Sequence, residues 1–279
     1  MSSRNSNSGQ PVFGKQEPLG LRLERLYSVW NDPRYIHPDP LEMVRPFRRA
    51  EDREIAALLA SSLAYGRVNQ ILKSVRRVLE VMGASPSAYL RNGSAERFDR
   101  DFSEFKHRFH TGRDLVLLLC GVRAALDRYG TLQHCFLAGF SERDRTVLPA
   151  VERFVEELCR FFPDGESTLL PSPKRGSACK RLHLMLRWLV RKDKVDPGGW
   201  DSVPRRCLLI PLDTHMHRLA RMLGLTARNA ADRRTAEEVT KAFSRCCPED
   251  PVRYDFVLTR FGIHPDFPRN PFENPAENP

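Results

Sequence analysis

The stretch Val68-Asn-Gln-Ile-Leu-Lys-Ser-Val-Arg-Arg-Val-Leu-Glu-Val-Met82 has the period of an amphipathic α-helix. Its apolar residues recur at steps of three and four, and Gly83 follows where a helix commonly ends in a left-handed residue. No convincing alternation of period two occurs, and the best strand candidate, 207–210, could equally lead into a helix. Stripes of helical period also occupy the segments 55–63, 115–126, 147–159, 182–189, 216–223 and 239–243. The sequence therefore predicts an all-α fold.

Local signals predict where some of these helices begin and end, and where the folded part of the chain lies. The segments 1–17 and 264–279 are rich in Pro, Asn, Ser and Gly, so we expect two disordered tails. No clean linker divides the residues between them, which predicts one helical domain over 18–263. The boundary signals are a capping box at Thr235-x-x-Glu238, a cap at Asp250 before Pro251, and left-handed glycines at Gly224 and Gly262.

The composition favours a soluble protein with a phosphate-bearing partner. The 279 residues include 45 Lys and Arg against 35 Asp and Glu, a net charge of +10, which suits nucleic acid but also occurs in proteins that never bind it. The seven cysteines form no C-x-x-C pair and indicate reduced thiols. No signal peptide or membrane-spanning run is present, so we expect a cytoplasmic monomer without membrane contacts.

Lys180 is the first candidate catalytic residue. The turn-rich segment 169–176 ends at Ser177, which predicts a capped helix that begins at Ala178 and holds Lys180 in its first turn. Helical phase puts Lys180, Arg187 and Arg191 opposite the apolar face, toward solvent or a ligand. A neutral lysine amine can displace a base from a sugar carbon. The alternative is a solvated lysine in a basic stretch.

Asp213 is the second candidate, because it precedes the apolar stripe of the next helix as an N-cap would. A carboxylate held there could stabilise a cationic sugar, although capping could also be its whole role. Asp213-Thr-His215-Met-His217 also matches the start of the metal sites of amidohydrolases. Such a site needs further ligands on later strands, whereas the chain beyond His217 is helical in pattern and contains one more histidine, His264. We therefore expect no metal.

Two phrases together, Gly176-x-x-x-Lys180 and Leu212-Asp213-Thr-His-x-x-Arg218, resemble the helix-hairpin-helix DNA glycosylase superfamily of endonuclease III. The long interval between Lys180 and Asp213 is similar to that of the archaeal 8-oxoguanine glycosylase branch. The resemblance implies a glycosylase-like helical fold with an active-site cleft between the 50–160 and 165–263 parts. It implies that Lys180 is a Schiff-base nucleophile and that Asp213 assists it.

The chain also departs from that pattern. Ala178 replaces the second glycine of the hairpin, and Pro171 and Pro173 occupy its approach. No cysteine follows Cys247, which excludes the iron–sulfur cluster of endonuclease III, and we expect no cofactor. The sequence of the whole chain, notably of segments 105–113 and 177–192, is more specifically similar to a bacterial family known only as a domain of unknown function.

The expected partner is double-stranded DNA, and the expected activity is that of a bifunctional glycosylase and lyase acting on damaged bases, oxidised ones included. The alternatives are a non-catalytic helix-hairpin-helix protein that binds nucleic acid, or an enzyme acting on RNA or a nucleotide. Phe105 and Phe109 either line a slot for a base or pack into the core, and 65–67 is either a wedge or a simple turn. The candidate DNA-binding residues are Lys174, Arg175, Gly176, Ser177, Arg187, Arg67, Lys106, Arg108 and Arg113.

Overall fold

A computed structural model describes residues 17–264, and its main elements are twelve α-helices. The predicted tails lie outside the described residues, apart from Glu17 and His264. No helix in the described part is long and apolar enough to cross a membrane. The helices are α1 (Leu19–Trp30), α2 (Ala50–Ser62), α3 (Val68–Met82), α4 (Pro86–Arg91), α5 (Ala95–Phe102), α6 (Gly112–Tyr129), α7 (Leu132–Leu137), α8 (Leu148–Cys159), α9 (Lys180–Val190), α10 (Thr214–Met222), α11 (Arg233–Ser244) and α12 (Asp255–Ile263).

The predicted all-α class is confirmed, and each segment with helical period lies within a helix, to within one residue at its ends. The helix α3 spans the residues predicted for it and ends at Gly83, which has a φ of 74°. The short helices α4, α5 and α7 have too few turns to show a period, and capping side chains mark them instead: Ser85, Ser94 and Thr131 each accept a backbone N–H. A two-stranded hairpin, β1 (Lys106–His107) with β2 (His110–Thr111), was not predicted.

Three predicted boundaries are wrong. The cap of α11 is Asp232, which accepts the N–H of Thr235, so Thr235 lies inside the helix and does not cap it. Asp250 and Pro251 stand in a turn before α12, which begins at Asp255, and α12 continues past Gly262 to Ile263. The candidate strand 207–210 is a buried lead-in to α10 that follows a short 3₁₀ turn, Arg205–Cys207. Gly224 does end α10, with a φ of 69°.

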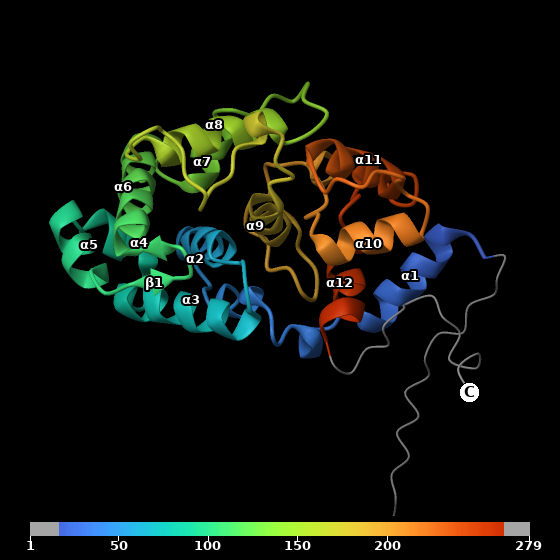
Figure 1. Cartoon of the computed structure of the whole chain (residues 1–279), viewed down its shortest axis with the longest axis horizontal. Helices are drawn as coiled ribbons and strands as arrows, with labels where there is room; N and C mark the ends of the chain where they lie inside the picture. Colours follow the sequence, from blue (N-terminus) through green and yellow to red (C-terminus); the bar gives the residue numbers. More distant parts are fainter. Residues whose placement is uncertain (1–16, 265–279) are drawn as a thin grey trace, which may run out of the picture.

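The helices form two groups with α9 between them (Figure 1). Helices α2 to α8 lie on one side, and α1, α10, α11 and α12 lie on the other. The central helix packs closely against α2, and residues 182–190 are all buried. Both groups of helices contact α9. Residues at the ends of α9 can therefore lie close to residues of either group.

The segment between α9 and α10 folds back along α9 and completes the core. Gly198 donates its N–H to the carbonyl of Trp188 at 3.0 Å, and Trp200 donates to that of Leu189 at 2.8 Å. The indole of Trp200 also donates to Glu54 on α2, at 3.0 Å. The same carboxylate accepts the first N–H groups of α7. Glu54 thus joins α2, α7 and the returning segment, which fixes the frame that holds α9.

Candidate active site at the start of α9

The chain enters α9 through a tight turn of left-handed residues. Gly176 has a φ of 77° and Cys179 has a φ of 45°, so the helix begins at Lys180. The hydroxyl of Ser177 accepts the N–H of Cys179 at 3.1 Å, and the thiol of Cys179 donates to the carbonyl of Pro171 at 3.1 Å. The predicted helix start at Ala178 is therefore wrong, because the left-handed backbone at Cys179 interrupts the helical path. Lys180 is the first residue of α9.

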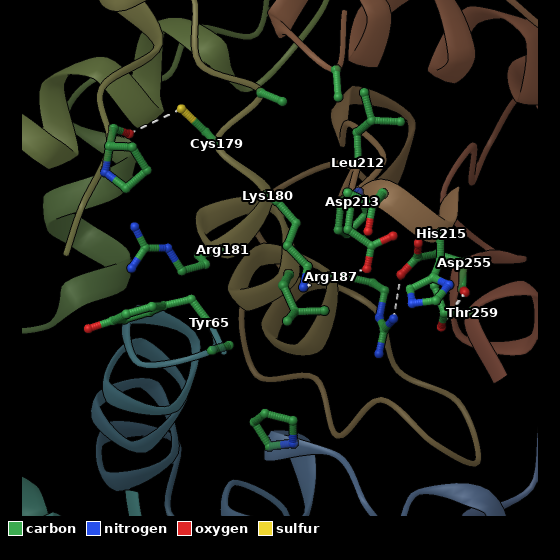
Figure 2. A pocket seen from close by; sticks show the side chains of 18 of the residues that line it. Tyr65, Cys179, Lys180, Arg181, Arg187, Leu212, Asp213, His215, Asp255 and Thr259 are labelled. Carbon is green, nitrogen blue, oxygen red and sulfur yellow. Dashed lines mark hydrogen bonds and ion pairs between the residues drawn. The ribbon is translucent and has the colours of Figure 1, made fainter. Parts of the chain in front are cut away.

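Asp213 caps the next helix, α10, as the sequence predicts. Its Oδ1 accepts the N–H of Met216 at 2.8 Å, which fixes the carboxylate at the helix start. Its Oδ2 lies 3.6 Å from the Nζ of Lys180. The two side chains point toward one another across the space between α9 and α10 (Figure 2). They keep 34% and 17% of their side-chain exposure, so a ligand can reach both.

The pair opens into a pocket of about 1040 Å³. Residues 64–66, Val68 and Ile71 form part of its wall, residues 175–181 with Leu184 and Arg187 form another, and residues 211–215 and α12 close it. Residues 38–40, which precede both predicted halves of the cleft, complete it. A cavity of this size can hold a nucleotide-sized ligand.

Eight of the nine candidate DNA-binding residues divide into three groups. Arg175, Gly176 and Ser177 line the pocket beside Lys180. Lys174 forms an ion pair with Glu156, and it is not a lining residue. Arg67 at the start of α3 and three hairpin-region residues, Lys106, Arg108 and Arg113, are exposed outside the pocket lining. Those four remain available to a partner on the surface near it.

Arg191 faces neither solvent nor the pocket, contrary to the prediction, and Arg187 is buried from solvent although it lines the pocket. Both side chains are only 2% exposed. Arg187 lies 3.3 Å from Asp196 and 2.5 Å from Asp255, and Arg191 contacts the carboxylates of Asp196 and Asp250. The returning segment, the turn before α12 and α12 itself supply these carboxylates, so the polar stripe of α9 is buried against acids. Arg187 borders the pocket, and two carboxylates already pair with its guanidinium.

Tyr65, which the sequence predicts to be part of a wedge or a turn, and Arg181, which sequence reasoning did not select, form the opposite wall of the pocket. The Arg181 guanidinium lies 5.0 Å above the Tyr65 ring and donates to the carbonyl of Ser62 at 2.6 Å. Within residues 17–264, no carboxylate lies within ion-pair distance of Arg181. Burial lowers the pKa of Arg181, which stays charged at neutral pH. In the sequence, the only sign that Arg181 belongs to the candidate site is its position directly after Lys180.

Hydrogen bonds to the β1–β2 hairpin fix the position of Tyr65. Its hydroxyl donates to the carbonyl of His107 at 3.0 Å and bonds the imidazole of His110, whose other nitrogen lies 2.7 Å from the hydroxyl of Thr168. Figure 2 shows this hydroxyl pointing away from Lys180. The ring therefore belongs to the pocket wall. Burial raises the pKa of Tyr65 and lowers that of His110, so both are neutral at pH 7.

The histidines after Asp213 lie in different places. His215 borders the pocket, whereas His217 bonds the carbonyl of Arg228 at 3.0 Å. Within the described stretch 17–264, no group of three or more His, Cys, Asp or Glu side chains is arranged to hold a metal ion.

The fold and site define an all-helical protein with a lysine–aspartate pair in a large, polar pocket. A family model described as a protein of unknown function, DUF2400, matches residues 39–264, and the chain belongs to this family. No match was found among curated proteins or among solved structures.

Proposed function

We propose that the protein is a DNA glycosylase with lyase activity that removes damaged bases from double-stranded DNA. The observation that carries this proposal is the 3.6 Å separation between the Nζ of Lys180 and the Oδ2 of Asp213, inside a pocket large enough for a nucleotide. The resemblance of the two sequence phrases around these residues to helix-hairpin-helix glycosylases supports the same reading. The net charge of +10 supports action on nucleic acid, and the seven free cysteines support a reducing compartment such as the cytoplasm. The proposal keeps the expected monomeric state.

In this mechanism the neutral amine of Lys180 attacks C1′ of the nucleotide. The bond from C1′ to the base breaks, and the base leaves with the electron pair and takes up a proton. Asp213 stabilises the positive charge on the sugar, and it can take the proton that the attacking nitrogen loses. Opening of the sugar ring gives an imine between Lys180 and C1′. Loss of a C2′ proton then expels the 3′-phosphate by β-elimination.

The wall of the pocket beside Asp213 is polar. Arg187, Asp255 and Arg260 line it as buried charged residues. Arg187 pairs with Asp255, and Arg260 pairs with Asp39. A polar wall suits a ligand whose edge carries hydrogen-bond donors and acceptors, as that of a nucleobase does.

The test is covalent trapping. The protein is incubated with a duplex that contains one abasic aldehyde site, and borohydride is added to reduce any imine. We expect a stable protein–DNA adduct with the wild-type chain and none with Lys180→Gln. Lys241→Gln is the matched control, because Lys241 is an exposed lysine on α11 outside the pocket lining.

The outcomes separate the proposal from its rivals. An adduct that persists in Lys180→Gln would contradict the assigned role of Lys180. Tight duplex binding by wild type without any adduct, on abasic, uracil or 8-oxoguanine duplexes, would favour a non-catalytic binding protein. Trapping only on RNA or nucleotide substrates would favour the third alternative.

A further inference from the structure

We infer that Phe109, at the tip of the β1–β2 hairpin, inserts into the base stack of duplex DNA beside the pocket. Phe109 is 83% exposed, the largest exposed fraction among the large apolar side chains that the structure shows as exposed. Its neighbour in the sequence patch, Phe105, is 3% exposed and belongs to the core. The two phenylalanines therefore have opposite roles. The inference rests on the proposed function for its partner, duplex DNA.

The hairpin holds its tip in a fixed position. His107 pairs with His110 across the two strands, and the turn between them consists of Arg108 and Phe109. The Nδ1 of His107 lies 2.8 Å from the hydroxyl of Ser74 on α3, and His110 bonds Tyr65 and Thr168. Arg108 has a φ of 53°, a left-handed conformation that is unfavourable for a residue with a side chain. Two-residue hairpin turns use this left-handed backbone, and here it places Phe109 at the tip.

The tip adjoins the rim of the pocket. A Cβ built on Gly66, a lining residue, would lie 2.7 Å from the Nη1 of Arg108. The same guanidinium lies 5.4 Å from the centre of the Phe109 ring. One side chain thus spans from the rim to the exposed ring. The strand β1 of the hairpin packs against α3 (Figure 1).

The charges around the tip fit phosphate on both sides of an inserted ring. Lys106, Arg108 and Arg113 are exposed here, and Arg67 is exposed at the nearby start of α3. The carboxylate of Asp114 is engaged with the N–H and hydroxyl of Thr111, in the capping box of α6. An apolar wedge flanked by cations is the combination with which proteins unstack a duplex at a base step. An extruded base would leave a gap that the ring can fill.

The test uses a duplex with a tetrahydrofuran abasic analogue, which has no aldehyde and cannot form an imine, so that binding is measured without chemistry. We expect Phe109→Ala to bind this duplex about 5- to 100-fold more weakly than wild type, as loss of one base–aromatic stack predicts. Phe161→Ala is the matched control, because Phe161 is another exposed phenylalanine, 49% exposed after α8. In Phe109→Trp the new indole should show quenched fluorescence on binding.

Equal affinities of Phe109→Ala and Phe161→Ala for the duplex, or an unquenched indole at saturating DNA, would overturn the inference, as would a wild-type chain that binds no duplex. Failure of the proposed chemistry has a different signature: no borohydride adduct forms with the abasic aldehyde, while binding still depends on Phe109. If both ideas hold, Phe109→Ala keeps the adduct on single-stranded abasic DNA and loses it on the duplex at low protein concentration.

Discussion

At the residue scale, Asp213 has two roles that one substitution can separate. Its Oδ1 caps α10 through the N–H of Met216, and its Oδ2 faces Lys180. The capping role is structural and needs only an oxygen acceptor. The catalytic role needs negative charge.

Replacement of Asp213 by Asn keeps the acceptor and removes the charge. Asn caps helices as well as Asp does, so we expect the free energy of unfolding to change by less than about 1 kcal/mol. We expect base excision to slow by about 100- to 1000-fold, since the cationic sugar loses its counter-charge. Thermal unfolding and single-turnover kinetics measure the two effects. Asp32→Asn, which alters the aspartate cap of a 3₁₀ turn outside the pocket lining, is the control. Wild-type rates in Asp213→Asn would remove Asp213 from the mechanism.

At the element scale, α9 shows where sequence reasoning succeeds and where it stops. The helix itself follows from the period of Leu182, Met185, Leu186 and Leu189. The helical phase correctly predicted that Arg187 lies opposite the apolar face. The further inference that its side chain is exposed was wrong. The partners of Arg187, Asp196 and Asp255, come from a returning segment and from α12, and no local pattern predicts that long-range pairing.

The buried pairs of α9 predict a strong stability effect. Arg187→Met leaves Asp255 buried without its cation, and we expect the free energy of unfolding to fall by about 3–5 kcal/mol. The double variant Arg187→Met with Asp255→Leu replaces the pair by apolar groups and should recover most of that loss. Denaturant unfolding of both variants measures the effect. Equal instability of the single and double variants would contradict the assignment.

A buried histidine on the same helix predicts acid sensitivity. Burial lowers the pKa of His183 to about 4, and the unfolded chain takes up the proton near pH 6.5. Between these two pH values the folded state therefore binds fewer protons than the unfolded chain. The contribution of His183 to stability is present above pH 6.5 and is lost as the pH falls toward 4. The loss amounts to about 3 kcal/mol.

Other groups titrate in that range, so the test of His183 is a difference. The free energy of unfolding of wild type and of His183→Leu is measured from pH 7 to pH 4. We expect the free energy of unfolding of His183→Leu to rise relative to that of wild type as the pH falls. Parallel curves would contradict the prediction.

At the scale of the whole molecule, the sequence predicts the fold class and the pairing of Lys180 with Asp213. It does not predict most of the other residues that line the pocket. The helical periods are local, and Lys180 and Asp213 stand in recognisable phrases. The hairpin is too short to show a strand period, and Tyr65 and Arg181 meet only because α2, α9 and the hairpin converge. Contacts of this kind depend on tertiary packing, which single-sequence patterns do not contain.

The distribution of charge predicts how DNA binding responds to salt. Lys106 and Arg113 are exposed near the hairpin, and replacing both by Gln should lower the slope of log affinity against log salt by about 2. Titrations of a tetrahydrofuran duplex at several salt concentrations measure the slope. The control is the pair Lys241→Gln, on α11, and Arg245→Gln, directly after it; α11 lies on the other side of the molecule from the hairpin (Figure 1). An unchanged slope in the hairpin variant would place the DNA elsewhere.

The central claim is that Lys180 forms a covalent bond to the sugar, and mapping the bond tests it most directly. Wild-type protein is trapped with borohydride on an abasic duplex, digested with nuclease and protease, and analysed by mass spectrometry. The account predicts that the reduced sugar remnant is attached to Lys180. Attachment to another amine, or no adduct at all, would contradict it.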